Sequence, residues 1–250
     1  MSAEKYFAEA QKVYDRIRST QLENIKRAAM LSADSIARGG LVHLFGSGHS
    51  VIPVLDVFPR YGSFAGFHPL MDSRLMWTQV LGSGGVRELL KLERTEGYVA
   101  TFLSNFKFEP TDTMVIYSHG GVNAAGIDVA LHAKSAGMKI VAVTSLDNAR
   151  IAKVTHSSGK KLADLCDVVI DNCCPPQDSL VEVGGTPVAA SSTLAVTAIS
   201  MALVAQIAAD LASRKIHFRA FVSPNVASVG SENNHEVFDE YVARVAPRLR

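Results

Sequence analysis

The sequence lacks an excess of charge of either sign. Its 250 residues contain 25 lysines and arginines against 24 aspartates and glutamates, so the formal net charge is only +1. Proteins that bind nucleic acid carry a basic patch or run, which neither the total charge nor any lysine-rich or arginine-rich stretch supplies here. With 48% hydrophobic and 20% charged residues, disorder is excluded as well. We expect a globular protein with a sizeable core and no nucleic-acid partner.

Cysteine is scarce too. The chain has only Cys166, Cys173 and Cys174. An odd number with two adjacent residues makes no disulfide framework, and the spacing is not that of a zinc site. We therefore predict reduced cysteines, no metal and a cytoplasmic location.

Long hydrophobic runs are nearly absent. The first residues are polar and charged, where a signal peptide has an apolar centre. The stretch from Leu194 to Ala209 is mostly apolar but short for a membrane span, and it contains three polar residues. A buried helix and no membrane association are expected.

Short apolar runs alternate with helical patterns along the chain. We predict strands at 41–45, 63–67, 114–117, 140–143 and 168–170, and helices at 4–37, 51–58, 85–105, 124–136 and 191–213. A polar loop at 223–235 precedes a last amphipathic helix. This alternation predicts an α/β fold: a doubly wound, flavodoxin-like, mostly parallel five-stranded sheet with N- and C-terminal helical additions. One domain spans 1–250, with a core at 35–215, a leading helix at 1–38 and a C-terminal loop and helix at 216–250.

Small hydroxyl residues gather where the predicted strands end. They are Ser47, Ser50, Ser118, Thr144 and Ser145, and a later helix starts with Ser191, Ser192 and Thr193. Ligands of open parallel sheets lie outside the carboxyl ends of the strands, and helix N-termini with hydroxyl donors bind anions without lysine or arginine. Such residues also make ordinary turns and helix caps. Three such loops on one sheet favour an anion site.

A nucleotide is a poorer fit than a small phosphorylated ligand. The segment Gly46–Val51 lacks the third glycine of a dinucleotide-binding loop. Phe67, His68 and Pro69 stand where an acidic residue would hold a ribose. We predict no cofactor.

The same loops resemble those of sugar isomerase (SIS) domain proteins. The resemblance rests on Gly46–Ser50, Ser118–Asn123, Thr144-Ser145 and Ser191–Thr193, and covers about residues 35–215. It implies a phosphosugar-binding fold. The substrate-binding residues that it implies are Ser47, Gly48, Ser50, Ser118, Gly120, Gly121, Asn123, Thr144, Ser145, Ser191, Ser192 and Thr193.

Two groups of relatives refine the resemblance. N-acetylmuramic acid 6-phosphate etherases have features similar to Leu55-Asp56, to an acidic residue aligned with Glu93, and to the segment Glu182–Thr186. Phosphoheptose isomerases carry a His and a Glu six and ten residues beyond the first-loop serine, where this chain has Asp56 and Arg60. That departure argues against phosphoheptose isomerase itself. Asn225 and the segment 232–234 resemble a further subgroup of SIS-domain proteins.

Two glutamates are the candidate catalytic bases. Glu93 lies on a predicted helix, where it is either a solvated carboxylate or a base that moves a proton between adjacent sugar carbons, with Glu96 as the fallback. Glu182 stands among apolar residues and is expected to be buried near the site.

Two histidines are candidates for opening the sugar ring. His49 and His119 each lie in a predicted anion loop, where each is either an acid–base group or a hydrogen-bonding residue of the loop. His68 ranks third. By resemblance alone, Asn234 and His235 are expected to complete the pocket of a neighbouring subunit.

The function expected from these features is an aldose–ketose isomerase of a small phosphorylated or sulfonated sugar. The resemblance implies the reaction class, and the residues supply an anion site and available bases. Two alternatives stay open: a lyase or etherase that pairs Glu93 with Glu182, and a non-catalytic sugar-phosphate sensor. By resemblance the protein is expected to be a homodimer or homotetramer with its site near the subunit interface.

Overall fold

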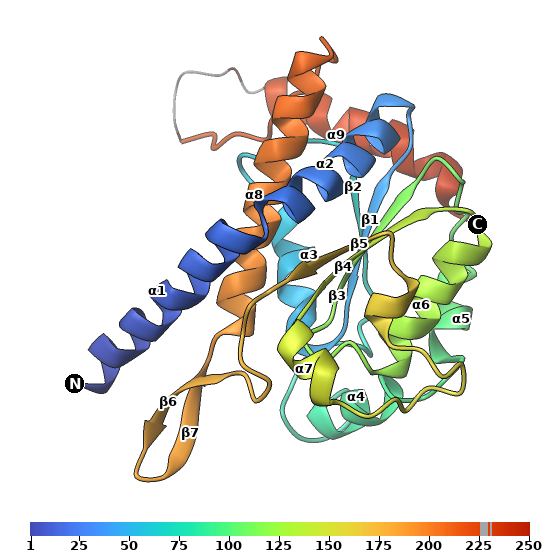
Figure 1. Cartoon of the computed structure of the whole chain (residues 1–250). Coiled ribbons are helices and arrows are strands. Elements are labelled where there is room, and N and C mark those ends of the chain that lie inside the picture. Colours follow the sequence, from blue (N-terminus) through green and yellow to red (C-terminus); the bar gives the residue numbers. More distant parts are fainter. Residues whose placement is uncertain (226–229, 231) are drawn as a thin grey trace.

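The computed structural model describes residues 1–225, 230 and 232–250 (Figure 1). Its helices are α1 (Ser2–Thr20), α2 (Leu22–Ala37), α3 (Val51–Val57), α4 (Val86–Leu92), α5 (Tyr98–Leu103), α6 (Ala124–Ser135), α7 (Leu146–Ile151), α8 (Ser192–Ser213) and α9 (Glu232–Val245). Its strands are β1 (Val42–Gly46), β2 (Phe67–Leu70), β3 (Thr113–Tyr117), β4 (Lys139–Thr144), β5 (Val168–Asp171), β6 (Ser179–Val183) and β7 (Thr186–Ala190).

Strands β1 to β5 form a parallel sheet in the order β2-β1-β3-β4-β5. Every residue of β1 and β3 is buried, as expected for central strands covered on both faces. The order reverses between β1 and β3, because the chain first adds β2 on one side and then β3 to β5 on the other. The predicted doubly wound, five-stranded sheet is confirmed.

Helices cover both faces of this sheet (Figure 1). Along β3, Val115 and Tyr117 pack into the core under α2, α3 and α8, whereas Met114 and Ile116 pack into the core under α5 and α6. Successive side chains of a strand point to opposite faces, so one apolar run supplies both cores.

Helix α8 is long and apolar enough to cross a membrane, with a mean hydropathy of 1.8. Its buried side chains, among them Ile199, Leu203 and Ile207, pack into the core beside α2 and α3. This is the packing of a core helix, as the sequence predicts.

Some predicted boundaries are wrong. The leading helix is two helices, which meet at Gln21, whose buried side chain accepts a hydrogen bond from the Asp171 N–H. The second strand lies at Phe67–Leu70 rather than 63–67, and it includes Pro69. Because β2 is an edge strand, a proline without an N–H is tolerated there.

Other elements differ as well. The predicted helix at 85–105 is the pair α4 and α5, divided by a turn that ends at Gly97 with a φ of 78°. The helix α7 and the hairpin β6–β7 correspond to no predicted element. Part of the predicted loop at 223–235, namely 226–229 and 231, lies outside the described residues, and α9 begins at Glu232.

Candidate active site at the β1/β3 edge

The candidate site lies at the carboxyl ends of β1 and β3, where the strand order reverses. Crevices form at such switch points because the connections on either side leave in opposite directions. Two loops border it: the first loop, Gly46–Ser50, and the second loop, Ser118–Asn123. Helices α3 and α6 begin directly after these loops and direct their N-termini to this edge.

The first loop turns so tightly that its glycines are required. A Cβ on Gly46 would lie 2.1 Å from the Ser50 carbonyl oxygen, and Gly48 has a φ of 59°. The Gly48 N–H donates to the Leu75 carbonyl at 2.8 Å, which fixes the loop against the segment that follows β2.

Glu93 lies beneath the first loop, at the end of α4. It is only 6% exposed. The Ser47 hydroxyl donates to its Oε2 at 2.9 Å, the Asn123 side chain lies near enough to the same carboxylate to lower its pKa, and Arg94 approaches Oε1 at 3.3 Å. Two candidate binding residues, one from each loop, therefore meet one buried carboxylate.

Burial raises the pKa of Glu93, while the contacts with Ser47, Arg94 and Asn123 oppose that shift; the net pKa is raised. A buried carboxylate with a raised pKa is suited to accept a proton near neutral pH. Of the two possibilities for Glu93, the solvated surface carboxylate is wrong.

The second loop is shaped around its own hydrogen bonds. Ser118 Oγ accepts from the Gly121 N–H at 3.2 Å, and Gly121 has a φ of 61°. Ala125 N, in the first turn of α6, donates to the Glu93 carbonyl at 3.0 Å. The start of α6 and the end of α4 are thereby tied together, so Asn123 and Glu93 have a fixed relative position.

His49 is exposed at the rim of the first loop. Its ring lies 4.5 Å from the Trp77 ring, centroid to centroid. It remains accessible to a ligand held by Ser47 and Ser50.

His119 has a different environment. Its Nδ1 accepts from the Asn172 side-chain amide at 3.3 Å, and its Nε2 contacts the Pro176 carbonyl at 3.2 Å, which requires the hydrogen on Nε2. Both ring nitrogens hold the segment 172–178. The structure therefore gives His119 the hydrogen-bonding role of the two that the sequence left open.

That segment closes the carboxyl ends of β4 and β5. Thr144 donates to the His119 carbonyl at 3.2 Å, and Ser145 donates to the Cys174 carbonyl at 2.8 Å. Both residues are fully buried. Their predicted place in an open anion site is not what the structure shows, because their hydroxyls bond to the chain itself.

The hydrogen-bond donors at the start of α8 are also bonded to the chain itself. Asp178 accepts from the N–H groups of Ser191 and Ser192 at 3.0 and 2.6 Å, and from their hydroxyls at 3.1 and 2.6 Å. The sequence predicts that these groups bind a substrate anion, but in the structure they bind a carboxylate of the protein itself. Thr193 follows in the first turn of the helix.

The remaining candidates lie elsewhere. Glu182 is exposed on β6, in the hairpin that extends away from the sheet (Figure 1), so its expected burial is wrong. Glu96 binds Ser157, and Asn234 binds the backbone of Val222. His68 is 4% exposed, beside His43, and burial lowers its pKa to about 3.

Three residues that make these contacts were not predicted from the sequence. Arg94 directly follows Glu93, and Asp178 and Asn172 lie in the segment after β5. The neighbouring position of Arg94 was a usable signal, whereas nothing in the spacing links Asp178 to Ser191. Among the residues that the structure describes, no group of three or more His, Cys, Asp or Glu side chains is arranged to hold a metal ion.

Comparison with known proteins agrees with this architecture. A family model for the SIS domain matches residues 5–145, and the chain belongs to the SIS domain family. More narrowly, it belongs to the UPF0309 family. It is 32% identical over 245 residues to a UPF0309 protein of Caldanaerobacter subterraneus subsp. tengcongensis, covering 96% of this chain and 97% of that one. It is 32% identical over 236 residues to one of Streptomyces coelicolor, covering 92% and 91%.

Solved structures show the same fold at low sequence identity. Phosphoheptose isomerase from Neisseria gonorrhoeae superposes with a TM-score of 0.56 at 16% identity, covering 83% of this chain and 97% of that one. The phosphoheptose isomerase from Francisella tularensis gives 0.53 at 16% identity, with coverages of 82% and 95%. The likeness extends across nearly the whole length of both enzymes.

Proposed function

We propose that this protein is an aldose–ketose isomerase that acts on a small anionic sugar at the β1/β3 edge, with Glu93 as the general base. The observation that carries the proposal is the burial of the Glu93 carboxylate beneath the first loop, where it meets Ser47 and Asn123. Membership of the SIS domain family supports a reaction on a sugar phosphate.

The anion is held by the two loops at this edge. The hydroxyls of Ser50 and Ser118 provide donors without a lysine or arginine, and the N-terminal end of α6 adds its dipole. These donors suit the tetrahedral oxygens of a phosphate or of a sulfonate. Sugars with one such group at the end of a four- to seven-carbon chain would place their reacting carbons near Glu93.

Isomerisation requires one proton to move between neighbouring carbons. The Glu93 carboxylate removes the proton from the hydroxyl-bearing carbon beside the carbonyl, which leaves an enediolate, and then returns it to the former carbonyl carbon. The proton of the neighbouring hydroxyl passes to the former carbonyl oxygen, so that the hydroxyl becomes the new carbonyl. Donors beside Glu93, namely Ser47 and Asn123, stabilise charge that develops on the sugar oxygens. His49, at the exposed rim, passes a proton to the ring oxygen when a cyclic sugar opens.

Thermal denaturation with candidate sugars is the first test. A sugar present at 100 times its dissociation constant adds about 2.7 kcal/mol of stability. The panel contains phosphorylated and sulfonated sugars of four to seven carbons, with inorganic phosphate and sulfate as the anion controls. If no sugar raises the melting temperature above its matching anion control, the proposed sugar site is wrong.

Proton exchange then distinguishes the reaction classes. With the sugar that binds, deuterium from solvent is expected at C1 or C2 of the product. Binding without turnover identifies a sensor, and loss of a group from the neighbouring carbon identifies a lyase. Either result overturns the proposed isomerase activity.

The expected location is the cytoplasm. Cys166, Cys173 and Cys174 are free thiols, and burial raises the pKa of each of them. Unpaired cysteines of this kind are typical of reducing compartments.

A further inference from the structure

Trp77 is the single tryptophan of the chain, and it lies beside the candidate site. Its side chain is partly buried and packs on the core under α5 and α6. The indole also contacts His49: the two ring centroids are 4.5 Å apart, and the ring planes are inclined by 54°. Aromatic rings at this distance attract one another beyond the area that they bury. Trp77 therefore connects the core to the histidine that we propose opens the sugar ring.

The backbone around Trp77 is attached to the first loop and to itself. Within the first loop, the Gly48 N–H donates to the Leu75 carbonyl at 2.8 Å, and Leu75 is buried. Directly after Trp77, the Thr78 N–H donates to the Gly84 carbonyl at 3.3 Å. Because the chain is held on both sides of Trp77, the indole has a fixed position relative to the first loop.

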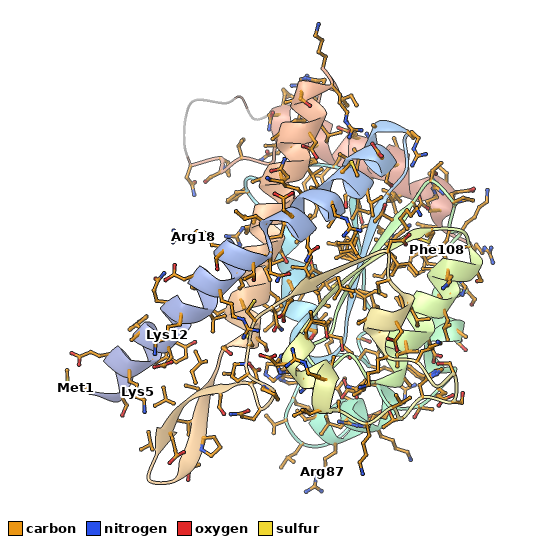
Figure 2. All side chains as sticks on the ribbon, in the orientation of Figure 1. Met1, Lys5, Lys12, Arg18, Arg87 and Phe108 are labelled. Atoms are coloured by element: carbon orange, nitrogen blue, oxygen red, sulfur yellow. The ribbon has the colours of Figure 1, made fainter. Side chains whose placement is uncertain are left out.

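Helix α4 supports the first loop from another direction. Near its start, Arg87 points away from the molecule (Figure 2), whereas Leu89 is buried. A Cβ built on Gly48 would lie 3.8 Å from Leu89 Cδ2 and 3.9 Å from Glu93 Oε2. The carboxylate of the proposed base therefore lies next to the residue that precedes His49.

The two histidines of the loops are held in different ways. Both ring nitrogens of His119 are hydrogen-bonded, whereas the described part of the chain offers the His49 ring no hydrogen-bond partner. Both nitrogens of His49 are therefore available to exchange a proton with a ligand. An exposed ring without hydrogen bonds can turn between rotamers, so its orientation depends on the ring that it packs against.

We propose that Trp77 is a positioning residue, whose indole holds the His49 ring in the orientation from which it opens a cyclic sugar. In that step the bond between the anomeric carbon and the ring oxygen breaks, and the ring oxygen takes the proton from His49. The anomeric hydroxyl gives its own proton to solvent and becomes the carbonyl. A proton donor must lie within hydrogen-bond reach of the oxygen that it protonates, which is why its orientation matters. The inference rests on the proposed function and specifies one step of it.

Kinetics on aldose phosphates of five to seven carbons, which close to rings, test the positioning role. Trp77→Leu keeps an apolar side chain and is expected to lower kcat by about tenfold to a hundredfold with little change in KM. Trp77→Phe, which keeps an aromatic ring, should retain most of the activity. Because Trp77 acts through His49, the double variant Trp77→Leu/His49→Ala should lose no more activity than His49→Ala alone.

The matched control for core packing is Phe102→Leu, since the Phe102 ring packs on Phe106 in the same core. Melting temperatures establish that each variant is folded. A kcat equal to that of the wild type in Trp77→Leu overturns the positioning role, and so do losses that multiply in the double variant. An equal loss of kcat in Phe102→Leu overturns it as well, because the effect is then one of core packing.

Fluorescence tests the ring contact without a substrate and without a variant of Trp77. An imidazole in contact with an indole quenches its emission, most strongly when the imidazole is protonated, and all tryptophan emission of this chain comes from Trp77. In mildly acidic buffer His49→Ala should raise that emission, and His119→Ala, the control on the second loop, should leave it unchanged.

The two measurements distinguish the failure of this inference from the failure of the proposed function. Unchanged emission in His49→Ala overturns the contact and the positioning role, whatever the activity of the wild type. A wild type that converts no sugar overturns the proposed function and the positioning role with it, even where the emission shows the contact.

Discussion

The carboxyl edge of the five-stranded sheet is built in two ways. At β1 and β3, two serine- and glycine-containing loops surround the buried Glu93 and leave His49 exposed. At β4 and β5, the segment 172–178 lies over the edge, and its carbonyls accept from Ser145 and His119. In sequence both halves end in the same small hydroxyl residues. What separates them is exposure: Thr144 and Ser145 are fully buried, whereas Ser47, Ser50 and Ser118 are partly exposed.

The comparison also concerns charge. The start of α8 holds the Asp178 carboxylate, which accepts hydrogen bonds that a substrate anion would otherwise accept. The start of α6 has the Glu93 carboxylate beside its N-cap residue Asn123, but among the described residues no carboxylate accepts from the first N–H groups of α3 or α6. The Asp178 carboxylate therefore stabilises the fold, whereas the proposed function places the ligand anion beside the start of α6.

Substitution of Glu93, in the β1/β3 half, should produce the largest loss of turnover. Glu93→Gln keeps the shape and the hydrogen bonds but removes the base, so turnover is expected to fall by about 10²- to 10⁴-fold. Sugar binding, measured by thermal shift, should be retained. The control is Glu88→Gln on the same helix, where Glu88 pairs with Arg74. Equal turnover in Glu93→Gln and wild type would remove Glu93 from the mechanism.

The two histidines should separate activity from stability. His119→Ala leaves the Asn172 amide without its partner and removes one of two donors to the Pro176 carbonyl, and is expected to cost about 1–3 kcal/mol in urea unfolding. His49→Ala removes an exposed ring and is expected to change stability by less than about 0.5 kcal/mol. For a sugar that binds as a closed ring, turnover should fall more for His49→Ala. A larger loss of turnover in His119→Ala than in His49→Ala would contradict the assignment of the β1/β3 half as the binding site.

Removal of the Asp178 carboxylate should affect the fold alone. Asp178→Ala leaves the start of α8 without its cap, and caps of this kind contribute about 0.5–2 kcal/mol. Asp178→Asn, which keeps one acceptor oxygen, should lie between Asp178→Ala and wild type. Unfolding by urea measures both. A variant that gains sugar affinity instead would show that Asp178 blocks a binding site.

The smallest expected effect is a pH dependence of stability from Glu93. Its folded-state pKa is raised by burial, so the folded protein holds the proton more tightly than the unfolded chain does. The resulting stability is fully present below the unfolded pKa and is lost as pH rises through the folded pKa. Subtracting the Glu93→Gln profile from the wild-type profile of unfolding free energy should isolate this decline. A difference that grows with pH would contradict the raised pKa.

Much of the fold was predictable because buried parallel strands are short apolar runs that end in small residues. The strands β1, β3, β4 and β5 were found within one or two residues for this reason. The edge strand β2 was displaced, because the apolar run at 63–67 was taken as the strand that in the structure lies at Phe67–Leu70. The hairpin β6–β7 was missed although Gly184-Gly185, both at positive φ, is a hairpin turn signal.

The candidate site was predictable in part. Loop composition located Ser47 and Ser118, and the family resemblance suggested Asn123 and Glu93. The burial of Glu93 and the exposure of Glu182 were not predictable, since both depend on which distant loop crosses over the side chain. Asp178 was missed together with the hairpin β6–β7, because that hairpin brings Asp178 beside Ser191, 13 positions further along the chain.

The most direct test compares ligand-induced stabilisation in two paired variants. Ser50→Ala/Ser118→Ala removes two hydroxyls from the β1/β3 half, and Ser191→Ala/Ser192→Ala removes two from the start of α8. With the anionic sugar that stabilises the wild type, the first variant should lose most of its rise in melting temperature. The second should melt at a lower temperature without ligand but retain the full ligand-induced rise. Loss of that rise in the second variant, with retention in the first, would place the anion in the half that this structure shows as closed.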